Sequence, residues 1–139
     1  MGNLGSLDIS LHGSGDFEVD NVDGDANLKS HGSGNVDLNY LTGSLTYSGH
    51  GSGNFDATSV KGLTASLRTH GSGNIEIDGG QVDMLTVVSH GSGSVDYDGR
   101  AQTAKLKSSG SGDIKVEYVK GDVDIQSSGS GDVDVEKRG

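Results

Sequence analysis

Apolar and polar residues alternate in short segments that recur along the whole chain. From Phe17 to Asp20 apolar residues alternate with acidic ones, and after a turn at Gly24 the alternation resumes with Ala26 and Leu28. A period of two is typical of β-strands that have one buried face. No segment of helical length spaces its apolar residues at a period of 3.6, so we expect an all-β protein.

This two-strand pattern returns at a nearly constant interval that is marked by a short glycine-rich motif. The motif reads His-Gly-Ser-Gly or Ser-Gly-Ser-Gly, with copies 19 or 20 residues apart that begin at His12, His31, His50, His70, His90, Ser109 and Ser128. Most intervals hold the same five apolar positions, which one repeat fills with Phe55, Ala57, Val60, Ala65 and Leu67. A fixed period of this length predicts a repeat fold.

Such a repeat cannot bury its apolar side alone, but winding stacks equivalent strands about 4.8 Å apart over a continuous core. The pattern predicts a β-solenoid, specifically a single-stranded right-handed β-helix with 19–20-residue coils. We expect one domain over residues 1–139, made of a half coil at 1–11, six coils at 12–127 and a partial coil at 128–139. An antiparallel barrel also has short, regularly spaced strands, but it does not explain why one tetrapeptide marks every circuit.

The glycine pair of each motif predicts a coil corner, where a side chain would clash with the coils above and below or where φ is positive. Alternation then places His31 and Ser33 outside the coil and Ser30 inside. The fifth repeat departs from the pattern, because it carries Arg100 where its neighbours have Val or Leu.

The recurring Ser-Gly-Ser-Gly-Asp-(Ile/Val) pattern, seen at 109–114 and 128–133, resembles the motif of bacterial putative adhesin families. These include the auto-transporter adhesin head (GIN) family. The resemblance covers nearly the whole chain, although no Gly-Ile-Asn tripeptide occurs and five repeats carry His in place of Ser. It implies a β-helix with an extracellular or cell-surface role, and no defined chemistry.

Composition changes the picture mainly through charge. Ten Lys and Arg against 20 Asp and Glu give a net charge of −10, which disfavours nucleic acid and anionic membranes as partners. Lys29, Arg68 and Lys107 share one outward position, but three such cations do not make a nucleic-acid stripe. The chain has no Cys, and its apolar runs are far shorter than the roughly 20 residues of a transmembrane helix.

The histidine column is the first candidate for a binding site. Neighbouring coils bring imidazoles close enough to suggest a shared metal ion such as Zn²⁺, with His12, His31, His50, His70 and His90 as the candidate ligands. The alternative is a surface ladder without a ligand. Ser109 and Ser128 favour this alternative, because they continue the column without an imidazole.

Acidic residues form a second column, in which stacked like charges oppose folding unless something compensates for them. Carboxylates at this spacing could hold Ca²⁺, and the candidates are Glu18, Asp37, Asp56, Glu76 and Asp96. We expect any stabilisation by calcium to be diffuse. The alternative is a solvated face that keeps the rod soluble.

Repetition itself argues against catalysis, because an active site needs one supported arrangement and a repeated motif offers several equivalent ones. We therefore expect a structural or adhesive module without a required cofactor. Its expected partners are further copies joined end to end, or a surface glycan or protein. The alternatives are a metal-binding repeat protein and a carbohydrate-active β-helix enzyme, for which the segment from Asp96 to Arg100 is the only break in the repeat.

Overall fold

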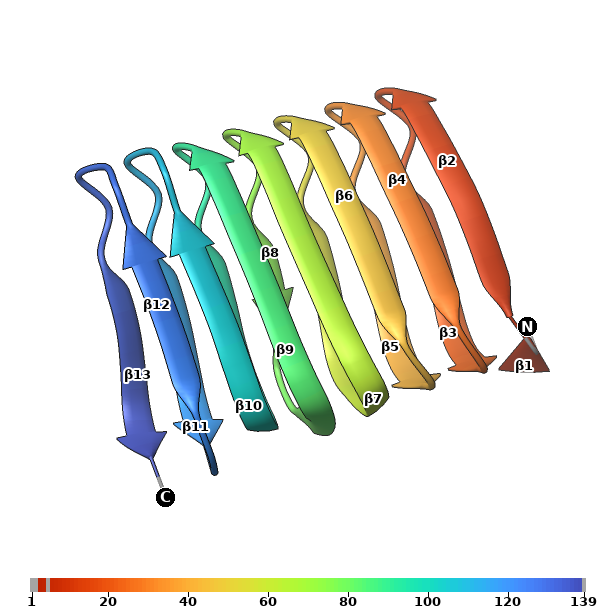
Figure 1. Ribbon diagram of the computed structural model, residues 1–139. Coiled ribbons are helices and arrows are strands. Elements are labelled where there is room, and N and C mark those ends of the chain that lie inside the picture. Colours follow the sequence, from red (N-terminus) through yellow and green to blue (C-terminus); the bar gives the residue numbers. More distant parts are fainter. Residues whose placement is uncertain (1–2, 5, 139) are drawn as a thin grey trace.

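The chain winds into a flattened right-handed β-solenoid of about 7 turns (Figure 1). The structure is a computed structural model and describes residues 3–4 and 6–138. Near strands run upward and far strands downward while the chain advances from right to left, which makes the winding right-handed (Figure 1). The predicted fold class is confirmed. The predicted single domain includes Met1, Gly2, Gly5 and Gly139, which lie outside the described residues, and its boundaries stay a prediction.

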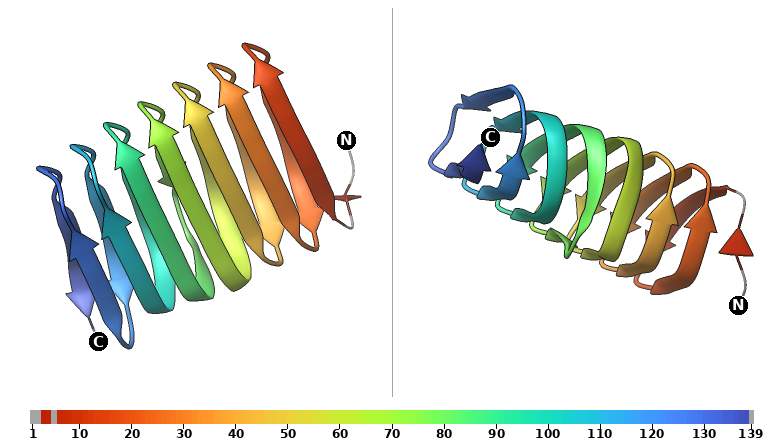
Figure 2. Two further views of the ribbon diagram at one scale, coloured as in Figure 1. Left: turned by 45° about the horizontal axis from the view of Figure 1, so that its top comes forward. Right: turned by 90° about the horizontal axis from the view of Figure 1, so that it is seen from below.

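Two parallel faces enclose the core, with β1 at one end of the stack and β13 at the other (Figure 2). The front face contains β2 (Leu7–Gly13), β4 (Ala26–Gly32), β6 (Leu45–Gly51), the second part of β7 (Phe55–Gly71), β9 (Gly80–Gly91), the second part of β10 (Val95–Ser108) and β12 (Val123–Ser127). The back face contains β1 (Asn3–Leu4), β3 (Phe17–Asp23), β5 (Val36–Thr42), the first part of β7, β8 (Ile75–Ile77), the first part of β10, β11 (Ile114–Val119) and β13 (Val133–Arg138). The described residues contain no helix that could cross a membrane.

Backbone pairing joins each residue to the equivalent residue of the next coil. Leu28 pairs with Tyr47 in β6, and Tyr47 pairs with Leu67 in β7. The pairing continues through the turns, where the Val36 amide donates to the Asn54 carbonyl at 2.9 Å. Side chains of one repeat position therefore form a column along the solenoid axis.

The inward columns form one apolar core. In the coil that begins at His50, the five predicted positions are all at most 3% exposed, namely Phe55, Ala57, Val60, Ala65 and Leu67. Burying a side chain such as Leu67 stabilises the fold by about 1.5–3 kcal/mol relative to leaving it exposed. At the ends of the stack, Leu7 and Val123 are only partly buried, because the described residues place a neighbouring strand on only one side of each.

Two coils of 20 residues fit the stack because the extra residue lies at one corner. Thr42 pairs with Lys61 at an interval of 19, whereas Leu45 pairs with Ala65 at an interval of 20, so the extra residue lies between Lys61 and Ala65. Leu63 in this segment is 68% exposed.

The 19-residue interval returns in β10, where Tyr97 pairs with Ile77 at an interval of 20 and Arg100 pairs with Gln81 at an interval of 19, so β10 skips one position between them. β10 and β11 also shift by one residue between Tyr97 and Arg100, and the strands beyond these corners remain paired.

This skipped position corrects the prediction for Arg100. The register places Arg100 opposite Gln81 and Tyr118 on the outer surface, and Ala101 fills the inward position at 2% exposure. Arg100 lies over the Tyr118 ring, 5.3 Å from its centroid. The expectation that Arg100 replaces a core residue was wrong, because a one-residue deletion shifts the alignment.

The glycine motif forms the corner predicted for it. Gly32 has a φ of +117°, a conformation that side chains with a Cβ rarely adopt. At Gly34 and Gly53 the constraint is space, because an added Cβ would overlap the backbone carbonyl oxygen of the equivalent glycine one coil earlier. These glycines let the corners of successive coils stack.

A hydrogen bond from a buried hydroxyl stabilises the corner on its inner side. The Ser89 hydroxyl, 1% exposed, donates to the Gly93 carbonyl at 3.2 Å. Thr69, Ser108 and Ser127 make the equivalent bond in their coils. In the coil that contains Gly49, the Tyr47 ring takes up this space.

We predict that Gly53→Ala destabilises the solenoid by about 3 kcal/mol, because a Cβ there has no room and overpacking costs this much. Gly15→Ala is the matched control at the same repeat position, where nothing lies within 4 Å of an added Cβ. Urea unfolding of both variants measures the difference. Equal stability of the two variants would contradict the crowded-corner interpretation.

Candidate functional site

The five histidines form a stacked ladder along one edge of the front face. Ring centroids of successive pairs are 5.1, 4.8, 4.7 and 4.8 Å apart, for His12, His31, His50, His70 and His90 in order. The inner pairs are nearly parallel, with angles of 2° and 3° between ring planes. This spacing follows from the backbone register, which pairs each histidine with the next.

Hydroxyl groups contact both ends of the ladder. The Ser109 hydroxyl is hydrogen-bonded to His90 Nδ1, and the Ser10 hydroxyl lies 3.3 Å from His12 Nε2. Inside the ladder, His70 Nδ1 is buried and has no hydrogen-bond partner. In the histidine repeats the strand continues through the following glycine, whereas β10 ends at Ser108 and β12 at Ser127.

The ring spacing bears on the predicted metal site. Two imidazole nitrogens that share Zn²⁺ lie at most about 4.2 Å apart, since each Zn–N bond is about 2.0–2.1 Å. Parallel rings at 4.7 or 4.8 Å keep equivalent nitrogens farther apart than that. Among residues 3–4 and 6–138, no group of three or more His, Asp or Glu could hold a metal ion. Zinc binding by the ladder stays a prediction, and it would require the rings to rotate.

The acidic column lies on the back face, where the register brings its members together one above another. Glu18 pairs with Asp37, Asp37 with Asp56, Asp56 with Glu76, and Glu76 with Asp96. With Asn39, Thr58 and Asp78 of the neighbouring column, four of these residues line an open groove of about 310 Å³. Calcium binding by this column stays a prediction.

Carboxylates in this groove raise one another's pKa. Burial raises the pKa of Asp56 above its ordinary value, and the charges of Asp37 and Asp78 add to this. For Glu76 the charge of Asp56 is the largest cause of a raised pKa. Burial is the largest cause for Asp96, followed by the charge of Asp98. The column is therefore a source of net repulsion at neutral pH.

A lysine relieves the repulsion at the far end of the column. Lys115 follows Asp96 in register, and its Nζ lies 3.5 Å from Glu136 Oε1 in β13. Both side chains are about half exposed, so the pair contributes less than about 1 kcal/mol. The ion pair joins the last two coils of the back face.

A third ladder was not predicted, although its signal is present in the sequence. The residue after each Gly-Ser-Gly is usually Asp or Asn, and its side chain accepts a hydrogen bond from the backbone of the equivalent residue in the next coil. The backbone N–H of Asn54 donates to Asn35 Oδ1 at 3.0 Å, and the backbone N–H of Asn74 donates to Asn54 Oδ1 at 2.9 Å. This ladder satisfies amides where the back-face strands begin, which is a structural role.

We predict that the acidic column contributes a stability that rises as the pH falls from 7 through the raised pKa of Asp56, Glu76 and Asp96. A raised carboxyl pKa means that the folded state binds more protons than the unfolded state between the two pKa values, so the free energy of unfolding rises as pH falls through this range. Asp56→Asn should stabilise the protein at pH 7, by less than about 1 kcal/mol because the side chain is solvent-exposed. It should also weaken the pH dependence.

Urea unfolding at several pH values measures this effect, with Asp83→Asn at the outer corner as the matched control. A stability that falls steadily from pH 7 to 5, with Asp56→Asn less stable than the control at pH 7, would show that the acidic column is compensated.

Comparison with known proteins assigns the chain to a family. The family model described as "Putative auto-transporter adhesin, head GIN domain" matches residues 6–139. No curated protein matched the chain, and neither did any solved structure. The resemblance inferred from the glycine motif is confirmed, despite the missing Gly-Ile-Asn tripeptide. The chain belongs to the putative auto-transporter adhesin family, in which it matches the head GIN domain.

Proposed function

We propose that the chain is a rigid adhesive module exposed at the cell surface, which makes weak contacts through many equivalent side chains. The observation that carries this proposal is the register, which repeats the same outward groups in coil after coil. Family membership supports adhesion as the general role. The family description supports cell-surface exposure, since an adhesin head must reach its partner.

The segment from Asp96 to Arg100 favours adhesion over glycoside hydrolysis. Its two carboxylates, Asp96 and Asp98, are neighbours on one strand, where burial and then the charge of Asp98 raise the pKa of Asp96. A glycosidase instead places two carboxyl groups on opposite sides of the scissile bond. Tyr97 between them is fully buried and donates to the Arg100 carbonyl at 2.8 Å, so it packs the core.

We predict strongly density-dependent adhesion. The test passes beads that carry the protein at increasing surface density over arrays of glycans and matrix proteins. The number of retained beads should rise more than linearly with surface density. The reason is that linked weak sites gain avidity of about 100-fold or more. Beads that carry an unrelated protein of equal net charge are the control. No retention at any density, or equally tight binding by the free monomer, would contradict the proposal.

End-to-end association is a second candidate function. The described residues leave the outer edges of β2 and β12 without a backbone partner, and Ile125 at the end of a core column is 38% exposed. Exposed strand edges of this kind can pair with another copy. The alternative is that further coils of a longer chain cover them.

We predict that sedimentation velocity detects oligomers that grow with concentration, and that Ile125→Lys suppresses them by placing a charge in the apolar seam. Gln126→Lys is the matched control, because Gln126 points outward from the same strand and should leave assembly intact. A monomer at the highest concentrations, or equal assembly of the two variants, would exclude this function.

A further inference from the structure

The front face carries a column of cations that repeats every second coil. Lys29 pairs in register with Ser48, Ser48 with Arg68, Arg68 with Val88, and Val88 with Lys107. Three positive charges therefore alternate with an uncharged hydroxyl or methyl-bearing side chain. With strands about 4.8 Å apart, the cations repeat at about 9.6 Å along the axis.

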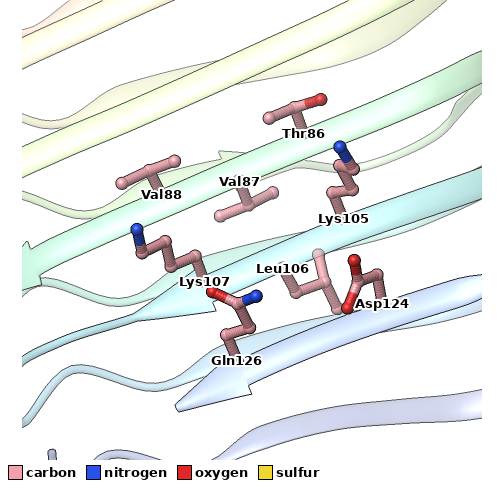
Figure 3. A pocket seen from close by; sticks show the side chains of 8 residues that line it. All are labelled: Thr86, Val87, Val88, Lys105, Leu106, Lys107, Asp124 and Gln126. Atoms are coloured by element: carbon pink, nitrogen blue, oxygen red, sulfur yellow. The ribbon is translucent and has the colours of Figure 1, made fainter. Parts of the chain in front are cut away.

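These cations are available to a ligand. Within the described part of the chain, Lys29, Arg68 and Lys107 form no ion pair with an Asp or Glu, and all three are exposed. Lys105 adds a fourth charge in the neighbouring column. Near Lys107 the surface forms an open hollow of about 190 Å³ (Figure 3).

The side chains in this hollow combine charge, hydrogen-bonding groups and an apolar surface. The amino groups of Lys105 and Lys107 lie towards β9, beside Thr86 and Val88 respectively, while Asp124 and Gln126 approach from β12 (Figure 3). The hollow forms because Thr86 and Val88 are shorter than the two lysines. Two cations beside hydroxyl and amide groups suit a ligand that has carboxylates and hydroxyls together.

The net charge of −10 does not exclude such a ligand, because the charges are segregated. Outward carboxylates on the described front strands are Asp8, Asp83 at the outer corner and Asp124, whereas the acidic columns lie on the back face. Packed sheets are about 10 Å apart, and the Debye length at physiological ionic strength is about 8 Å. A ligand on the front face is therefore largely screened from the back-face carboxylates.

We propose that the front face binds a linear acidic polysaccharide with one carboxylate on every second sugar, laid along the solenoid axis. One sugar of an extended chain spans about one coil, so successive carboxylates would meet Lys29, Arg68 and Lys107. The sugars between them would contact Ser48 and Val88. This inference rests on the proposed adhesive function and names its ligand class.

Two other occupants fit the face less well. Phosphates of each strand in a DNA duplex repeat at about 3.4 Å along the helix axis, which is much denser than the cations. For a single strand, the column offers no aromatic side chain for base stacking. A second copy would present its acidic column, in which carboxylates occur in consecutive coils such as those of Asp37 and Asp56. Half of these carboxylates would face an uncharged side chain across the interface.

The test measures binding of a hyaluronan decasaccharide, which has one carboxylate on every second sugar, to the full chain by calorimetry and NMR shift mapping at physiological ionic strength. We expect shifts at Lys29, Arg68 and Lys107. Arg68→Ser with Lys107→Ser should weaken binding about tenfold, because each exposed ion pair contributes a factor of about two to five. Lys61→Ser with Lys120→Ser removes equal charge outside the column and should leave binding unchanged.

A charge-conserving variant tests the spacing directly. Ser48→Arg with Arg68→Ser keeps the number of cations but breaks the two-coil interval, and it should weaken binding while leaving the unfolding transition unchanged. The proposal would be overturned if this variant, or Arg68→Ser with Lys107→Ser, bound hyaluronan as tightly as the unaltered protein does. Binding of neutral dextran as tight as that of hyaluronan would also overturn it, as would concentration-dependent self-association through this face. Beads that adhere to other ligands while hyaluronan fails would overturn this inference and leave the adhesive function standing.

Discussion

Every feature of this molecule depends on one constraint, the pairing of each backbone residue with its equivalent in the next coil. The constraint holds because corners without side chains, such as Gly34 on Gly15, let successive coils approach to hydrogen-bonding distance. Once the backbones are in register, side chains have no choice of neighbour. Apolar side chains stack on apolar ones, asparagine on asparagine and carboxylate on carboxylate.

Stacking like on like has opposite energetic effects in different columns. It is favourable in the core and in the Asn54 ladder, where each side chain satisfies the amide above it. It is unfavourable around Asp56, whose neighbours oppose its ionisation. The repulsion between like charges is therefore concentrated among the carboxylates of the back face. The cations near Arg68 lie on the front face, which has no carboxylate column to compete for them. A single net charge hides this polarity.

Periodicity in the sequence was enough to predict the solenoid, the core positions such as Leu67 and the outward histidine column, because register converts sequence spacing directly into contact. It failed at Arg100, where a one-residue deletion shifts the alignment and only the paired strands show which residue faces inward. It also missed the corner bond made by Ser89, since a hydroxyl partner depends on the fold of the turn. The sequence also contains the two-coil spacing of the cations. Only the structure shows that these cations lie on the face opposite the acidic columns.

The corner at Leu63 separates the length of a coil from the shape of its faces. The segment between Lys61 and Ala65 holds one residue more than the preceding coil, with Leu63 exposed to solvent, while Lys61 and Ala65 on either side remain paired with Thr42 and Leu45. The pairing of the coils therefore does not depend on the length or sequence of the segment at this corner, provided that the residues on either side of it remain paired. This corner offers a place where a longer loop, and with it a new recognition surface, could be added without altering either ladder.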